Sequence, residues 1–270
     1  MQLKLIRHLW GVDQGWETAF GRIRAEGFVG VEGPLVAPED VERFSVLRKT
    51  HALEYVAMAF TGGDSVAAHV RSFEQQVHRA VELGASQLTC QGGSDTWNPG
   101  DAESFYREAL AIEASVKLPV AHETHRGRVF FNPWITRSLL EKFPPLRLCC
   151  DFSHWVCVAE RLGWDDPAGT ILKICASRCI HIHARVGYPE GPQVPDPSAP
   201  EYANELAEHE RWWEVIWSAQ RDRGCRFSTF TPEFGPPGYL HTLPHTNVPV
   251  ADLWTICKWM ADRLARRFTQ

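Results

Sequence analysis

The chain alternates between short apolar runs and longer segments in which apolar residues recur every three or four positions. Short, nearly continuous apolar runs are typical of strands buried on both faces of a parallel sheet, and the wider spacing is typical of the helices that cover it. We predict strands at residues 3–10, 28–33, 53–60, 86–93, 118–123, 146–151, 179–185 and 227–234. Helical spacing is clearest at 65–85, 102–116, 203–224 and 250–267.

The number of these units selects the fold class. Eight strand–helix repeats in 270 residues favour a closed (β/α)8 TIM barrel, which typically needs about 250 residues. A dinucleotide-binding sheet is disfavoured because no G-x-G-x-x-G motif follows the first predicted strand. We interpret the Pro-rich segment 188–202, and also 235–249, as loops over the barrel mouth, because strand and helix patterns continue around them. The sequence therefore predicts a single α/β barrel domain over 1–270.

Composition and charge narrow the possible functions. A hydrophobic content of 44% is enough for a large core, and a net charge of −5 lacks the basic surplus that nucleic-acid binding requires. The N-terminal stretch does not resemble a secretion signal, and no apolar run is long enough to span a bilayer. We expect a cytoplasmic protein with no membrane or nucleic-acid partner. The eight cysteines show no C-x-x-C spacing, so we expect reduced core thiols rather than disulfides or a cysteine-based zinc site.

Chemically reactive side chains follow one another at the ends of the last four predicted strands. Strand five ends at Glu123, strand six at Asp151, strand seven at His183 and strand eight at Glu233. In a parallel barrel these ends share one rim, so three carboxylates and one imidazole would lie together. Their mutual repulsion would be relieved by one divalent cation. Oxygen-rich ligation with one nitrogen favours Mn²⁺, with Mg²⁺, Co²⁺ or Zn²⁺ as alternatives.

Each of these residues also has a simpler interpretation. Asp151 is suitably placed to cap a helix that begins near His154, and Glu233 fits a solvated turn. His181 and His183 lie on the same side of one strand, so one of them would serve as a core histidine. We prefer His183 as the ligand because it lies nearer the carboxyl end of the strand. The coincidence at four successive strand ends favours the metal site.

Four segments together resemble the xylose isomerase-like TIM-barrel family, the sugar phosphate isomerases and epimerases that include ketose 3-epimerases. They are HETHRGR (122–128), DFSH (151–154), HIH (181–183) and TPEFGPPG (231–238), and the resemblance spans essentially the whole barrel. It implies that Glu123, Asp151, His183 and Glu233 hold one divalent metal, and that His154 contacts substrate hydroxyls. In the ketose epimerases an arginine beyond H-x-H also reaches the substrate, and Arg185 lies closer to His183 than that arginine does.

The resemblance also implies a reaction, which is isomerisation or epimerisation of a sugar or related hydroxy-ketone through a metal-stabilised enediolate. Glu123 and Glu233 would act as base and acid in turn. His125, with the arginines of the same segment, would neutralise Glu123 or bind an anionic substrate group, or else belong to a solvated basic loop. Trp10, Glu32 and Trp155 would line the pocket or, as is usual for aromatic residues, pack in the core.

Several alternatives remain open from the sequence. An inosose-type dehydratase, or another lyase or isomerase acting on a non-sugar substrate, would use the same site. An apurinic-site endonuclease is disfavoured by the acidic charge balance, and a non-catalytic barrel by the presence of all four candidate ligands. We expect a small polyol-like or ketose-like substrate. The sequence leaves open its identity and phosphorylation, the native metal and whether the chain forms a homo-oligomer.

Overall fold

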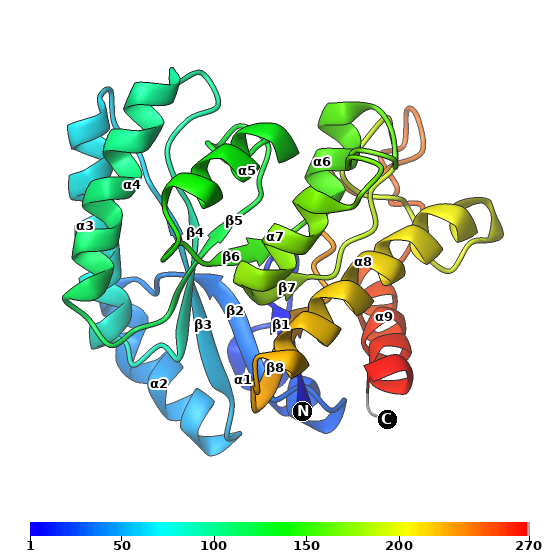
Figure 1. Ribbon diagram of the computed structural model, residues 1–270. Helices are drawn as coiled ribbons and strands as arrows, with labels where there is room; N and C mark the ends of the chain where they lie inside the picture. Colours follow the sequence, from blue (N-terminus) through cyan, green and yellow to red (C-terminus); the bar gives the residue numbers. More distant parts are fainter. Residues whose placement is uncertain (269–270) are drawn as a thin grey trace.

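The computed structural model describes residues 1–268, and within them eight parallel strands close into a barrel (Figure 1). Strand order follows the sequence, and β1 pairs with β8 to complete the closure. This confirms the predicted (β/α)8 fold. The strands are β1 (Gln2–His8), β2 (Gly30–Pro34), β3 (Glu54–Phe60), β4 (Gln87–Gln91), β5 (Val120–Glu123), β6 (Leu148–Cys150), β7 (Cys179–His183) and β8 (Phe227–Thr231).

Helices surround the barrel, with α3 and α4 on one side and α8 and α9 on the other (Figure 1). The four helical segments predicted above correspond to α3, α4, α8 and α9. The helices are α1 (Trp16–Ala25), α2 (Val41–Thr50), α3 (Val66–Glu82), α4 (Pro99–Ala114), α5 (Pro133–Lys142), α6 (Ser153–Ala159), α7 (Thr170–Arg178), α8 (Ala203–Asp222) and α9 (Leu253–Phe268), with 3₁₀ turns η1 (Pro38–Asp40) and η2 (Pro200–Tyr202).

The strands are buried on both faces because one face packs against the helices and the other fills the barrel. In β7 the two faces carry different chemistry. Ile182 belongs to the hydrophobic cluster, whereas His181 and His183 both contact Glu32 of β2. Alternation along the strand therefore separates an apolar helix-facing layer from a polar interior layer.

Five strands, β1, β4, β6, β7 and β8, end one to three residues earlier than the sequence pattern predicts. β8 stops at Thr231 because Pro232 has no amide hydrogen to donate to the ladder, so Glu233 lies two residues past the strand. β1 stops at His8, and the amide of Trp10 donates to His8 Nδ1 instead of to a neighbouring strand. β6 stops at Cys150, one residue before Asp151. The side chains of Trp10, Asp151 and Glu233 still follow carboxyl ends of strands, on the face where barrel enzymes keep their active sites.

The long loops after β7 and β8 are joined by two hydrogen bonds. The Gln193 side chain donates to the carbonyl of Gly235 at 3.1 Å and accepts from its amide at 2.6 Å. The segment from Gly191 to Val194 is buried. The Pro-rich segment is therefore a packed loop, as predicted, and not a linker.

Most of the cysteines lie in the core. All eight cysteines are free, and six of them are buried. Within residues 1–268, no helix combines the length and apolar character needed to cross a membrane.

His209 on α8 predicts a pH-dependent contribution to stability. Its ring accepts from the amide of Gly187 and contacts the carbonyl of Glu205, and burial lowers its pKa to about 4. An unfolded histidine binds protons below about pH 6.5, so the free energy of unfolding falls as the pH drops from 6.5 towards 4. Between pH 7 and 5 this one group should account for about 2 kcal/mol. Urea titrations should show that loss reduced by this amount in His209→Gln, and unchanged in the exposed control His78→Gln.

Candidate metal centre and active site

Four candidate ligands meet at the carboxyl end of the barrel. Glu123, Asp151, His183 and Glu233 are all buried, and each offers one atom within 4.8 Å of the others. His183 Nδ1 lies 2.8 Å from Glu233 Oε2 and 3.3 Å from Glu123 Oε1. Ligand atoms about 2.1 Å from one ion are separated from each other by roughly 3–4 Å, so the spacing suits a single cation.

Three of these atoms have no hydrogen-bond partner among the described residues. They are His183 Nδ1, Glu123 Oε1 and Glu233 Oε2. Buried polar atoms without partners are rare in folded proteins, and here the three face one another. A divalent cation would satisfy all three at once, so the residues present fit the metal predicted from the sequence.

Glu32 positions the ring of His183. Its Oε1 lies 3.0 Å from His183 Nε2 and its Oε2 lies 3.0 Å from His181 Nε2, while the hydroxyls of Thr89 and Thr231 donate to the same carboxylate. A proton on His183 Nε2 leaves the Nδ1 lone pair free for a metal. Glu32 is completely buried and does not line the cavity, so the interpretation of Glu32 as a pocket residue was wrong. His181 takes the alternative role of a core histidine.

The charges of the cluster favour a cation at this point. Burial alone would lower the pKa of His183, but Cys149, Glu233, Glu32 and Glu123 outweigh it and raise the pKa well above its usual value. Burial raises the pKa of Asp151 to about 6, although Arg185 acts in the opposite direction. The field that holds a proton at His183 would equally stabilise a metal ion there.

Arg185 is the counter-ion of Asp151. Its Nη2 lies 2.5 Å from Asp151 Oδ2 and 3.6 Å from Glu233 Oε2, and it also contacts His154 Nε2 at 2.6 Å. The other oxygen of Asp151 accepts from the amide of Ser153 at 3.1 Å, at the start of α6. Asp151 therefore accepts the first amide of α6 although it lies one residue before the N-cap, Phe152, and both of its oxygens already have partners.

The predicted substrate contacts fall into two groups. His125, Arg185 and Trp10 line the cavity, and Trp10 packs edge-on against Tyr239 with ring centroids 5.0 Å apart. His154 is fully buried beneath Arg185 and is not among the residues that line the cavity.

The packing decides two interpretations that the sequence left open. Arg128 donates to the carbonyls of Thr61 and Gly93, so it ties neighbouring loops together rather than belonging to a solvated basic turn. Trp155 is completely buried, and its indole donates to the carbonyl of Phe130, so it belongs to the core.

Two further residues, which were not predicted from the sequence, contact the carboxylates. His8 accepts the Trp10 amide at Nδ1, which leaves its Nε2 to face Glu233 Oε1 at 3.4 Å, and Gln91 donates to Glu123 Oε2 at 2.9 Å. Both are the last residues of strands, β1 and β4. The strands predicted from the sequence end two residues further on, at residues 10 and 93, so predicted strand ends alone did not identify them.

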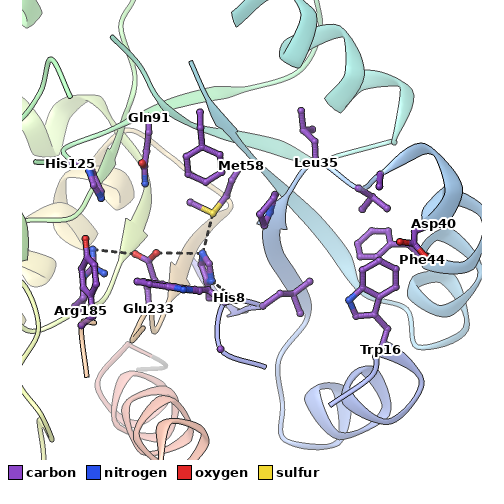
Figure 2. Close-up of a pocket in the computed structure, with 18 residues that line it drawn as sticks. His8, Trp16, Leu35, Asp40, Phe44, Met58, Gln91, His125, Arg185 and Glu233 are labelled. Atoms are coloured by element: carbon purple, nitrogen blue, oxygen red, sulfur yellow. Dashed lines mark hydrogen bonds and ion pairs between the residues drawn. The ribbon is translucent and has the colours of Figure 1, made fainter. Parts of the chain in front are cut away.

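A cavity of about 670 Å³ opens beside this cluster (Figure 2). Its polar end is formed by His8, Gln91, His125, Arg185 and Glu233; Figure 2 shows the last four gathered on one side, with His8 next to Glu233 toward the middle. The volume is within the range of roughly 300–1,000 Å³ that holds small organic ligands. The candidate metal centre thus adjoins a space large enough for a substrate.

Comparison with known proteins identifies the class of fold. No protein-family model and no curated protein sequence matches the chain. Among solved structures it is similar to a 3-keto-D-glucoside 4-epimerase from E. coli, with a TM-score of 0.66 and 11% identity over 98% of this chain and 100% of that one. It is also similar to a probable 3-DHS dehydratase from Bacillus anthracis, with a TM-score of 0.64 and 16% identity over 98% of this chain and 100% of that one.

A third similar structure is a xylose isomerase-like TIM barrel protein from Mycobacterium smegmatis in complex with magnesium. It gives a TM-score of 0.65 and 11% identity over 99% of this chain and 97% of that one. All three share the fold of this chain, and the third is itself described as a xylose isomerase-like barrel, so the resemblance drawn from the sequence holds at the level of fold. Identity this low shows a shared fold and does not choose among activities.

Glu32→Gln should weaken Mn²⁺ binding by about 10- to 100-fold, because loss of the carboxylate removes the group that orients His183. Calorimetric titration with Mn²⁺ measures this directly. The matched control is Glu113→Gln, which alters a second histidine–glutamate pair, with His122 at 2.8 Å, outside the cluster. Equal Mn²⁺ affinities in the two variants would show that Glu32 has no part in metal binding.

Proposed function

We propose that this chain is a divalent-metal-dependent isomerase or epimerase of a sugar or related hydroxy-ketone. The observation that carries the proposal is a set of three buried atoms on Glu123, His183 and Glu233 that have no hydrogen bond among the described residues and face one another beside the cavity. With Asp151 they would hold one ion, for which Mn²⁺ is favoured by the oxygen-rich ligands. When bound, the metal would act as a Lewis acid that polarises the substrate carbonyl and acidifies the adjacent C–H bond.

Two carboxylates are available to move the proton. Glu233 lines the cavity and lies beside His8 and Arg185, so it would face a substrate bound there. Burial would raise its pKa, but His183 and Arg185 hold the pKa well below its usual range, so Glu233 is ionised and able to accept a proton. Glu123 is buried behind the cavity wall, where it accepts a hydrogen bond from the lining residue Gln91, and it would donate or accept on the other side of the reacting carbon.

The position of proton return decides the product. Return to the same carbon on the opposite face gives epimerisation, and return to the neighbouring carbon gives isomerisation. A dehydratase would use the same proton removal followed by loss of hydroxide, so it remains the alternative reaction on this site. The proposal also includes a cytoplasmic location and a small polyol-like or ketose-like substrate rather than nucleic acid.

Solvent isotope exchange tests the proposal. The Mn²⁺-loaded protein, incubated in D₂O with ketoses, inososes and hydroxypyruvate, should place deuterium next to the carbonyl of at least one compound. Retained mass apart from deuterium identifies an isomerase or epimerase, and loss of water identifies a dehydratase. Tight Mn²⁺ binding without exchange across the panel would argue against the proposed reaction.

A further inference from the structure

The cavity has two chemically different parts. Beyond the polar end described above, it continues into an apolar arm lined by Trp16, Leu35, Val36, Ala37 and Phe44. Figure 2 shows Leu35, Phe44 and Trp16 on the side opposite His125, Arg185 and Glu233, with His8 and Met58 between the two groups. The arm therefore leads away from the candidate metal centre.

The arm is built into the packed structure. Phe44 is buried on α2, with its ring centroid 4.9 Å from Tyr55 and 5.1 Å from Trp16. Arg43 on α2 pairs with Glu17 on α1 at 2.6 Å, which ties together the two helices that carry the aromatic walls. The walls are held by side-chain packing, so this space is largely preformed.

The lining selects against hydroxyl groups. Asp40, next to Arg43 at 3.7 Å, is the one titratable side chain among the described residues that line the arm side of the cavity. A polyol chain placed there would give up its hydrogen bonds to water and find only the Asp40 carboxylate as a side-chain partner, which is unfavourable. An alkyl or aryl group of similar size would instead gain from leaving water.

We propose that the substrate joins a hydroxy-ketone head, which would bind at the metal centre, to an apolar alkyl or aryl group that occupies the arm. The inference of a hydroxy-ketone head depends on the proposed function, whereas the inference of an apolar tail depends only on the lining of the arm. Such a substrate is an alkyl- or aryl-substituted hydroxy-ketone, or an oxo-sugar that carries an apolar substituent. A simple ketose would leave the arm unfilled.

Hydroxamates test the tail without requiring turnover, because their two oxygens chelate divalent metals. Calorimetry would compare acetohydroxamate, hexanohydroxamate and benzohydroxamate on the Mn²⁺-loaded protein. Burial of each methylene contributes about fourfold in affinity, so the longer ligands should bind at least about tenfold more tightly than acetohydroxamate. Ala37→Trp, at an exposed position on the wall, should remove that advantage and leave acetohydroxamate affinity within about twofold.

The matched control is Val46→Trp, an exposed position on α2 away from the cavity, which should keep the full advantage. Equal affinity of short and long hydroxamates for the wild type, or an advantage that survives in Ala37→Trp, would overturn the inference. Absence of Mn²⁺ binding would overturn the proposed function instead. In that case crystals of the metal-free protein soaked with benzohydroxamate still decide the inference, since a phenyl ring in the arm supports it and an empty arm rejects it.

Discussion

Glu233→Gln should lower the rate of solvent-deuterium exchange into the substrate by about 10²- to 10⁴-fold at saturating Mn²⁺, because an amide cannot accept the proton. Glu123→Gln should cause a loss of similar size if the two carboxylates act in turn. Both replacements keep the shape of the side chain, so circular dichroism and thermal unfolding should show a folded barrel. Isotope exchange followed by mass spectrometry measures the rate, and Mn²⁺ calorimetry shows how much of each loss comes from weaker metal binding.

Glu26→Gln is a suitable control for this experiment. Glu26 accepts hydrogen bonds from Trp254 and pairs with Arg22, away from the cavity, so exchange should proceed at the wild-type rate. Wild-type exchange in Glu233→Gln would remove that residue from the proton transfer. If only one of the two site variants loses exchange, a single-base mechanism would replace the two-carboxylate one.

Arg185→Met should destabilise the metal-free protein by about 3–5 kcal/mol at pH 8, because removing one partner of a buried ion pair leaves the charge of Asp151 uncompensated. The loss should be smaller at pH 5.5. Burial already raises the pKa of Asp151 to about 6, and without Arg185 that pKa rises further. The folded variant then binds a proton more readily than the unfolded chain, so its stability increases as the pH falls.

Urea unfolding in the presence of a chelator measures these free energies. The double variant Arg185→Met with Asp151→Asn should recover most of the loss, since it removes both charges together. Arg137→Met, which breaks an exposed pair with Glu141, should cost no more than about 1 kcal/mol. A similarly small effect of Arg185→Met at pH 8 would show that Arg185 does not stabilise Asp151, and would favour a purely substrate-binding role.

Much of the site was predictable because strand ends in a parallel barrel share one rim. The run of Glu123, Asp151, His183 and Glu233 at four successive predicted ends placed these residues together, and the structure brings them within 4.8 Å. The exact end of a strand mattered little. β8 ends at Thr231, two residues before Glu233, because Pro232 cannot continue the ladder. The chain still leaves the strand in a direction that keeps the Glu233 carboxylate beside the cavity.

The partners of Glu32 and Arg185 could be identified only from the distances between side chains of different strands. Glu32 has the sequence context of a second strand end, but it turns into the barrel because His181, His183 and two threonines offer it partners there. Arg185 carries no local sign that its guanidinium would pair with Asp151. Periodicity assigns a residue to a face, whereas pairing depends on which side chains reach it across the barrel.

The sequence by itself determined that eight strand–helix units form a parallel barrel, and that carboxylates and a histidine collect at one end of it. Both follow from hydrophobic periodicity and from the common direction of parallel strands, which are properties of the chain order. Only the tertiary structure decided which polar groups neutralise one another and where the cavity extends. Those outcomes depend on contacts between residues far apart in the chain, such as Arg185 with Asp151 and Trp16 with Phe44, and no local pattern encodes them.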